Sequence, residues 1–223
     1  MTDFQATEHN RVVRVPDRGH YDRATIYPII DEALVCHVAF VQDGRPLVIP
    51  TLHAREGDRL LLHGATTSRL IRHVAAGNEV SVAMTLVDGL VLARSVFHHS
   101  VNYRSVVLFG RGELSGDKEK MVQLERFTEK IIPGRWADAR QPNAKELKAT
   151  SVVAIPIDLA SAKIRTGGPH DDADDYDLPV WAGVLPIEQH FLPPETDPAM
   201  TSATPVPDYV TDYRAQRNRG VKK

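Results

Sequence analysis

The chain has 223 residues, and its 27 Lys and Arg nearly balance its 29 Asp and Glu, for a formal charge of -2. Hydrophobic residues make up 42% and charged residues 25%, which is ordinary for a globular protein and excludes disordered, collagen-like and disulfide-scaffold chains. The near-neutral balance also argues against a dedicated nucleic-acid-binding protein, which is usually basic overall.

Cys36 is the single cysteine, so an intramolecular disulfide and a CxxC metal or redox motif are excluded. It lies in an apolar run and is expected to be a small core residue. The N-terminus lacks the apolar segment of a signal peptide. The longest apolar stretch, 80–93, is interrupted by Asp88-Gly89 and is shorter than the roughly 20 residues of a membrane span. We therefore expect a soluble, cytoplasmic protein with no membrane partner.

The polar residues 1–23 are expected to form an N-terminal arm. A short helix is predicted at 27–33, with Pro28 tolerated in its first turn. A period-two pattern then predicts a strand at 34–41, and because both of its faces are apolar we expect it to be buried on both sides. Asp43-Gly44 is typical of a hairpin turn.

A second strand is predicted at 47–53. Pro50 inside it implies a sheet edge, a bulge or a place where something other than a strand meets the backbone. A third strand is predicted at 59–63. The hydroxyl-rich segment that follows leads into a short helix at 69–76, closed by Gly77-Asn78.

Strands continue in the second half of the chain. Asp88-Gly89 predicts another hairpin turn, between the first two of three strands at 79–87, 90–97 and 103–114. A longer helix is expected at 115–132, and its buried stripe comprises Met121, Leu124, Phe127 and Ile131. Two final strands are expected at 150–157 and 160–165, before a tail that is first acidic and then rich in proline.

Many short strands, two Asp-Gly turns and few helices indicate a mainly β protein, an antiparallel barrel with inserted α-helices. We expect an arm at 1–23, one barrel domain at 24–187, with bounds that follow the family resemblance described below, and a Pro-rich tail at 188–223. The tail is expected to wrap the surface or to be partly flexible.

Several common catalytic motifs are missing from the sequence: a GxxxxGK[ST] phosphate loop, HExxH and GxSxG. Gly110-Arg111-Gly112 lacks the third glycine of a dinucleotide fingerprint and lies inside a predicted strand. We interpret it as a bulge or as a site of close strand packing.

One segment has the features of an anion site. At 63–69 a strand ends, and Thr67 and Ser68 precede a helix whose free backbone N–H groups attract anions. Arg69 can bind a phosphate through two parallel hydrogen bonds. The alternative is an ordinary helix N-cap with a solvated arginine.

Two pairs of polar residues are open to more than one interpretation. His98 and His99 are adjacent and without nearby carboxylates, so no metal site is expected. They are candidate proton donors, or hydrogen-bonded loop residues. Lys163 and Arg165 share one strand face and either tune a cofactor or protect a solvated sheet edge by their charge.

Four segments, in this order, resemble the pyridoxamine 5'-phosphate oxidase-related FMN-binding proteins, and more narrowly the branch that contains nitroimidazole-resistance proteins. They are VIPT (48–51), HGATTSRL (63–70), DGLVLARS (88–95) and HHSVNYRSVV (98–107). Three later segments, 146–150, 162–167 and 180–186, resemble the same branch, and the resemblance covers roughly 24–187.

The resemblance implies a split β-barrel of the antiparallel Greek-key type that forms a homodimer with FMN at the subunit interface. Ser68 and Arg69 match the oxidase's phosphate-binding pair, although Leu70 stands where the oxidase has a lysine. Lys163 and Arg165 are candidate cations near the flavin, where positive charge favours reduction. The full set of candidate cofactor-binding residues is Val48, Ile49, Pro50, Thr51, His63, Gly64, Thr67, Ser68, Arg69, Arg104, Ser105, Lys163 and Arg165.

The resemblance thus implies an FMN-dependent oxidoreductase acting on a small molecule. Two alternatives remain open: a non-catalytic flavin-binding or flavin-sensing protein, and a split-barrel relative that uses haem or a deazaflavin. Oxidation of pyridoxamine phosphate itself is not expected, because the oxidase's C-terminal block, rich in arginine and tryptophan, is not recognisable. Trp136 and Trp181 either cover the flavin or pack in the core or an interface.

Overall fold

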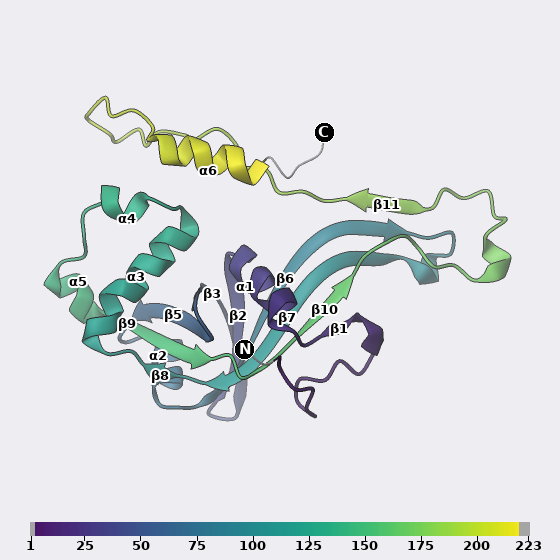
Figure 1. Cartoon of the computed structure of the whole chain (residues 1–223), viewed down its shortest axis with the longest axis horizontal. Coiled ribbons are helices and arrows are strands. Elements are labelled where there is room, and N and C mark those ends of the chain that lie inside the picture. The colour runs from purple at the N-terminus through teal and green to yellow at the C-terminus, as the bar shows by residue number, and fades with distance from the viewer. Residues whose placement is uncertain (1–2, 219–223) are drawn as a thin grey trace.

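The computed structural model describes residues 3–218 and consists of two antiparallel sheets with helices at their ends (Figure 1). The larger sheet has the order β1-β10-β7-β6-β2-β3, with β11 beside β6. Its strands are β1 (Gly19–His20), β2 (Val35–Gln42), β3 (Arg45–Leu52), β6 (Glu79–Leu92), β7 (Ser100–Arg111), β10 (Leu159–Arg165) and β11 (Gly183–Pro186).

The smaller sheet has the order β4-β5-β9-β8. Its strands are β4 (Ala54–Glu56), β5 (Arg59–Ala65), β8 (Glu113–Leu114) and β9 (Thr150–Pro156). Because the two sheets are antiparallel throughout and do not join into one closed cylinder, the expected split barrel is confirmed.

The helices are insertions between strands or additions at the end of the chain. They are α1 (Arg23–Glu32), α2 (Arg69–Ala75), α3 (Asp117–Ile131), α4 (Arg135–Asp138), α5 (Ala144–Ala149) and α6 (Asp208–Asn218), with 3-10 turns η1 (Pro16–Arg18), η2 (Val96–His98) and η3 (Ala173–Asp175). None of the helices between residues 3 and 218 is long and apolar enough to cross a membrane.

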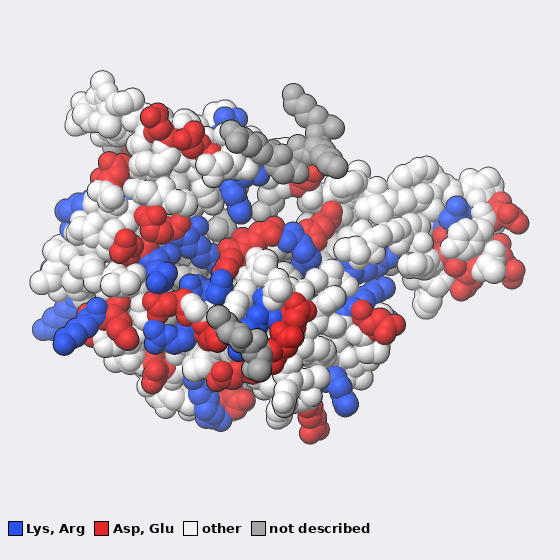
Figure 2. All heavy atoms as spheres, in the orientation of Figure 1, with Lys and Arg blue, Asp and Glu red and all other residues white. Residues whose placement is uncertain are grey.

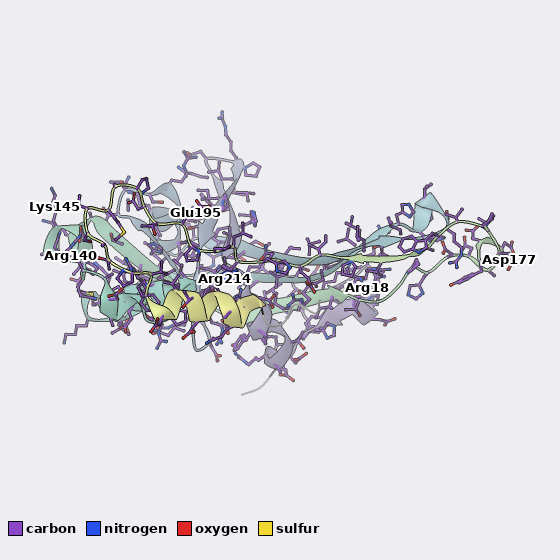
Figure 3. The ribbon with its side chains drawn as sticks, turned by 90° about the horizontal axis from the view of Figure 1, so that it is seen from above. Arg18, Arg140, Lys145, Asp177, Glu195 and Arg214 are labelled. Carbon is purple, nitrogen blue, oxygen red and sulfur yellow. The ribbon has the colours of Figure 1, made fainter. Side chains whose placement is uncertain are left out.

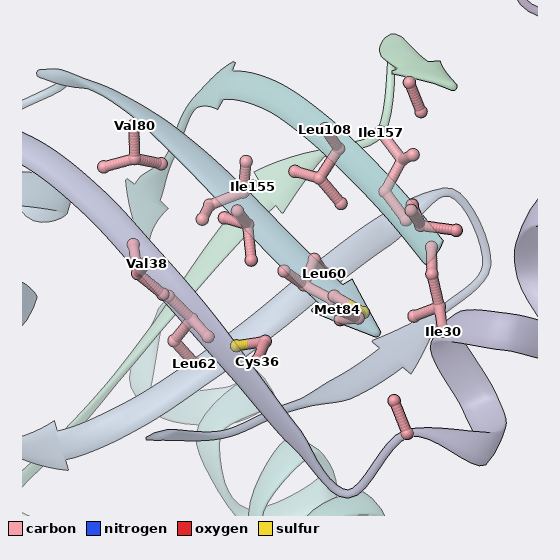
Figure 4. Close-up of a cluster of buried hydrophobic side chains, with 14 of the residues drawn as sticks. Ile30, Cys36, Val38, Leu60, Leu62, Val80, Met84, Leu108, Ile155 and Ile157 are labelled. Carbon is pink, nitrogen blue, oxygen red and sulfur yellow. The ribbon is translucent and has the colours of Figure 1, made fainter. Parts of the chain in front are cut away.

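The core lies between the two sheets (Figure 4). Cys36 is fully buried there, as expected, and burial raises the pKa of its thiol to about 12. It is therefore protonated at neutral pH. The other side chains at the centre come from both sheets and include Val38, Leu60, Leu62, Met84, Leu108, Ile155 and Ile157.

Helix α1 begins four residues earlier than predicted. The Asp22 carboxylate accepts a hydrogen bond of 2.7 Å from the Thr25 N–H and thereby caps the helix at Arg23. Pro28 consequently lies inside the helix rather than in its first turn, and the prediction of its position was wrong.

The two Asp-Gly pairs have different structures. Asp43 and Gly44 have φ of 52° and 73° and form the predicted hairpin turn between β2 and β3. Asp88-Gly89 is not a turn. The chain runs through it as one strand, β6, with a β-bulge between Val87 and Gly89.

Gly89 is needed where β11 approaches β6. A Cβ at this position would lie 3.1 Å from the Leu185 carbonyl oxygen, so a side chain would displace β11. The two predicted strands at 79–87 and 90–97 are therefore one strand. Together with β7 and β11, it extends as an arm from the body of the molecule (Figure 1).

Strand β2 is buried on one face only, which corrects the prediction of burial on both. Cys36, Val38 and Phe40 point into the core, whereas Val41 is 61% exposed on the outer face. Val48 of β3, which lies opposite Ala39, is also 61% exposed. The described chain thus leaves this apolar outer face uncovered.

Candidate functional site

The segment between β5 and α2 presents a free hydroxyl and a free guanidinium. The Ser68 N–H donates to the Ala65 carbonyl, which ends β5, and α2 begins at Arg69. The Ser68 side chain makes no capping hydrogen bond. Among residues 3–218, no carboxylate forms an ion pair with the exposed Arg69. Both groups can therefore bind an anion from outside the chain.

Gly64 and a backbone hydrogen bond at Thr66 fix the shape of this segment. A Cβ on Gly64 would lie 3.1 Å from the Ile71 side chain, so glycine lets α2 pack closely against β5. The Thr66 N–H donates to the Ala149 carbonyl across the end of β9. Thr67 is exposed beside Ser68. The local backbone is thus held by the sheet rather than by a ligand.

Strand β3 forms the edge of the larger sheet, which confirms one of the interpretations of Pro50. Pro50 lies opposite His37 of β2, and Val48 lies opposite Ala39. Val48 and Pro50 therefore share the outer face, while Ile49 and Thr51 point to the other side. Backbone groups on the free edge of β3 have no neighbouring strand and can bind a planar polar ligand.

Next to this edge lies a largely apolar cavity of about 350 Å³. Leu52 at the end of β3 and His63 near the end of β5 form one side, and helix α3 forms another. The remaining lining comes from α4, α5 and the segment between them: Trp136, Pro142, Glu146, Leu147 and Thr150.

This cavity explains why the predicted buried stripe of α3 is only partly correct. Phe127 is buried, but Ile131 is 46% exposed. Phe127 and Leu124 pack against Ala54, Leu61, Val152 and Ala154 and also line the cavity, together with Ile131. The helix therefore presents its apolar side to a space that can hold a ligand.

His63 is one of the polar residues that line this cavity. Its ring packs against Phe127 with centroids 4.3 Å apart. Neither ring nitrogen has a hydrogen-bond partner among residues 3–218, and Nδ1 is fully buried. Burial lowers the pKa of the imidazole, so His63 is neutral at pH 7. A neutral imidazole with a free nitrogen is the form that ligates metal ions.

Arg104 and Ser105, two further candidates, are engaged within the chain. Arg104 donates to both carboxylate oxygens of Glu32, at 2.5 and 3.0 Å, and to both of Asp88, at 3.0 and 2.8 Å. The Asp88 and Glu32 carboxylates raise its pKa. The Ser105 hydroxyl donates to the Lys163 carbonyl at 3.1 Å. In this structure Arg104 therefore links β6, β7 and α1.

Lys163 and Arg165 lie in β10, which is next to the edge of the larger sheet opposite β3. They line a second cavity, of about 510 Å³, together with His98 and His99. His98 Nε2 lies 3.3 Å from Asp172 Oδ2, and His99 Nδ1 accepts from the Ala93 N–H at 3.0 Å. Both histidines are thus hydrogen-bonded in the connection between β6 and β7.

The structure therefore divides the predicted site residues into separate groups. The end of β3 and the 63–69 segment lie near the first cavity, Arg104 is sequestered, and Lys163 and Arg165 line the second cavity. Trp136 lines the first cavity, whereas Trp181 is exposed on the arm. Within residues 3–218, no group of three or more His, Cys, Asp or Glu could hold a metal ion.

Sequence reasoning missed one buried pair of titratable groups, His53 and Lys130. His53 Nε2 lies 2.8 Å from Lys130 Nζ. The histidine falls at the end of a predicted strand and the lysine in the last turn of α3, so no local pattern connects them. It also missed that the N-terminal arm contributes Arg14 and Arg18 to the second cavity.

Comparison with known proteins places this geometry in context. The family model described as pyridoxamine 5'-phosphate oxidase matches residues 22–164. The flavocytochrome Anf3 from Azotobacter vinelandii has a TM-score of 0.88 and 40% identity, over 92% of this chain and 96% of that chain. The FAD and heme binding protein from Mycobacterium smegmatis has a TM-score of 0.84 and 37% identity, over 87% of this chain and 96% of that chain.

A more distant structure, described as a 5-nitroimidazole antibiotic resistance protein from Bacteroides thetaiotaomicron, has a TM-score of 0.56 at 22% identity, over 66% of this chain and 86% of that chain. At that identity the likeness concerns the fold alone. No curated protein matches the sequence.

Proposed function

Since the chain belongs to the pyridoxamine 5'-phosphate oxidase family, we propose that it is an oxidoreductase that binds a flavin and a haem. The names of the two similar proteins, a flavocytochrome and an FAD- and haem-binding protein, support this pair of cofactors. The observation that carries the proposal is the neutral imidazole of His63, which lines an apolar cavity and has no hydrogen-bond partner among residues 3–218.

Ser68 and Arg69 would bind the flavin phosphate. Neither side chain has a hydrogen-bonded or ion-paired partner among residues 3–218, and the edge of β3 lies on the same side of the fold as the first cavity, which Leu52 and His63 line together. FMN is the flavin that the family resemblance implies, and FAD contains the same phosphate and ring system with an adenylate added. The Ser68-Arg69 pair suits either flavin, because it would contact only the shared part.

The first cavity fits a haem in three respects. His63 offers an iron ligand, its lining is mostly apolar, and Phe127 and Trp136 provide flat aromatic surfaces. The sequence has a single cysteine, so the paired thioether attachment of a c-type haem is excluded and the group would be held without covalent bonds. When bound, a haem accepts and donates single electrons, whereas a flavin also accepts electrons in pairs.

The surrounding residues would keep His63 neutral and in place. Phe127 restricts the imidazole ring, and Leu124 and Ile131 exclude water from its surroundings. Glu146 at the cavity is tied to Arg140 by hydrogen bonds of 2.7 and 3.0 Å and caps α5, so its charge is neutralised. No uncompensated charge therefore opposes an apolar ring at this position.

Absorption spectroscopy tests the proposal. The purified protein should show flavin bands, and titration with haemin should produce a saturable Soret band. His63→Ala should remove the Soret band and leave the flavin bands, whereas the control His190→Ala, at an exposed residue of the tail, should change neither. A Soret band that is unchanged in His63→Ala would contradict the haem site.

Two further measurements resolve the finer points. Mass spectrometry of the released flavin distinguishes FMN from FAD. Consumption of a reduced nicotinamide nucleotide with an added electron acceptor distinguishes an oxidoreductase from a protein that only binds flavin. No turnover with any donor and acceptor pair would favour the non-catalytic alternative.

We also propose that the chain forms a homodimer through the outer face of β2 and β3. Val35, Ala39 and Val41 of β2 lie beside Pro46 and Val48 of β3 on this face, and Val41 and Val48 are more than half exposed. An apolar sheet face of this kind is unusual in a soluble monomer. A two-fold contact would cover it with the same face of a second copy.

A further inference from the structure

The second cavity is lined by an unusual number of cations. It lies between the N-terminal arm, the connection from β6 to β7, and β10, and its volume is about 510 Å³. Figure 3 shows Arg18 on the N-terminal segment beside the long strands β6 and β7. Asp177 lies at the far end of the extension that β6, β7 and β11 form. The charged and titratable lining residues are Arg14, Arg18, His98, His99, Lys163, Arg165 and His170.

None of the four permanent cations has an ion pair with a carboxylate in the described part of the chain. Arg165 is only 4% exposed. Its guanidinium donates to three uncharged oxygens, Asn102 Oδ1 and the carbonyls of Gly167 and Gly168, and its Nε has no partner. Lys163 Nζ donates to the Arg14 carbonyl at 2.8 Å, which is also uncharged.

The nearby carboxylates are used elsewhere or lie at the rim. Asp171 forms an ion pair with Arg94, and Asp172 forms one with His98 but is largely exposed. The other acidic residues of 171–177 lie toward the far end of the arm, where red atoms gather in Figure 2. The interior of the cavity therefore keeps its positive charge.

A buried guanidinium without a counter-ion is costly, because desolvation is not offset by a salt bridge. Burial lowers the pKa of Arg165, and the charge of Arg18 lowers it further. The N-terminal arm reaches the cavity at an additional cost, since Val15 adopts a left-handed φ of 55°, which is rare for a β-branched residue. A bound anion would offset the charge and account for this arrangement.

We infer that this cavity binds the diphosphate of a dinucleotide. The cavity has a volume of about 510 Å³ and four cations in its lining, and a diphosphate presents several anionic oxygens to them. Tyr103 and Phe97, the latter 86% exposed, lie in the same lining and offer surfaces for the attached rings. The site is distinct from the cavity beside His63, so the inference holds whether or not a haem binds there.

Calorimetric titration of the purified protein with pyrophosphate tests the inference. Pyrophosphate should bind saturably. Arg18→Gln and Lys163→Gln should each weaken this effect by about tenfold, because each removes one charge-assisted contact. Arg45→Gln, at an exposed residue of the β2–β3 turn, serves as the matched control and should bind as the unmodified protein does.

The dinucleotide is then identified with the same variants. The protein's own flavin is not the expected occupant, because its phosphate is placed at Ser68 and Arg69 beside the first cavity. Arg18→Gln and Lys163→Gln should therefore raise the KM for reduced NAD phosphate or NAD and leave the affinities for FMN and FAD unchanged. The inference is overturned if pyrophosphate does not bind, or if the two variants match Arg45→Gln for pyrophosphate and for the nicotinamide nucleotides.

Arg165 is tested separately because its hydrogen bonds also hold the loop after β10. Arg165→Lys keeps a charge and should retain part of the pyrophosphate affinity. Arg165→Met should lose more of that affinity than Arg18→Gln or Lys163→Gln. Circular dichroism of each variant verifies the fold. A folded Arg165→Met with unchanged pyrophosphate affinity would count against the site.

Discussion

His53 and Lys130 lie side by side in the protein interior, with His53 Nε2 2.8 Å from Lys130 Nζ and both atoms within 3.0 Å of the Ile30 carbonyl oxygen. Burial, and next the Lys130 charge, lower the pKa of His53 to about 4. Burial lowers the pKa of Lys130 to about 8. His53 follows the end of β3, and the pair connects it with α1 and α3, so its charge state bears on the stability of that region.

Stability should fall as the pH is lowered from about 6.5 to about 4. In that window the unfolded chain takes up a proton at His53 that the folded chain does not, so protonation favours unfolding. The full difference corresponds to up to about 3 kcal/mol. Urea unfolding at several pH values measures it.

The matched comparison is His53→Gln against His190→Gln. The first should flatten the pH dependence because the titrating group is gone, while an amide N–H can still bond the Ile30 carbonyl. The second, at an exposed histidine, should keep the slope. An unchanged slope in His53→Gln would assign the effect to other groups.

Arg104→Met should lower the free energy of unfolding by about 1–2 kcal/mol, because it removes two charge-assisted pairs from a partly exposed site. Arg111→Gln breaks the exposed pair with Glu79 and should cost less than about 0.5 kcal/mol. A double-mutant cycle with Asp88→Asn measures the share of the Arg104–Asp88 pair. Zero coupling there would show that Glu32 alone holds Arg104.

Gly112→Ala should destabilise the protein by about 1–3 kcal/mol. A Cβ at this position would lie 2.5 Å from the Val74 side chain and 2.9 Å from the Ala154 carbonyl oxygen, so the backbone must shift. Gly116→Ala meets nothing within 4 Å and should change stability by less than about 0.5 kcal/mol. Equal thermal midpoints for the two variants would contradict this packing argument.

Arg69→Ala should weaken flavin binding by about ten- to a hundredfold, because a bidentate contact to phosphate is lost. Arg45→Ala removes an exposed arginine elsewhere and is the control for general charge effects. Fluorescence titration with FMN and with FAD gives both affinities. If Arg69→Ala binds flavin as tightly as Arg45→Ala, the phosphate lies at another site.

Val48→Lys should dissociate the proposed homodimer without unfolding the chain, because it places a charge on the outer face and leaves the core untouched. Sedimentation over a dilution series measures the change. Val13→Lys, at another exposed valine in the N-terminal arm, is the control. An unmodified protein that is monomeric at high concentration would exclude this interface.

Much of the architecture was predictable because strand alternation and turn residues are local signals. The period-two pattern of 34–41 located β2 and the burial of Cys36, and Asp43-Gly44 located a turn. The same signal failed at Asp88-Gly89. There the identical dipeptide lies in a β-bulge of a continuous strand, and its glycine allows β11 to approach closely. A dipeptide does not reveal which distant strand will lie beside it.

The sequence by itself determined the mainly β fold and the family, and it predicted an anion site at Ser68 and Arg69, since each depends on residue types at short spacing. Only the tertiary structure decided that Arg104 is held by Glu32 and Asp88, and that His63 is left unpartnered in an apolar cavity. It also decided that Arg14 and Arg18 join Lys163 and Arg165 around one cavity. These relationships join residues up to about 150 positions apart, and packing sets them through the shape and charge of neighbouring elements that local patterns do not encode.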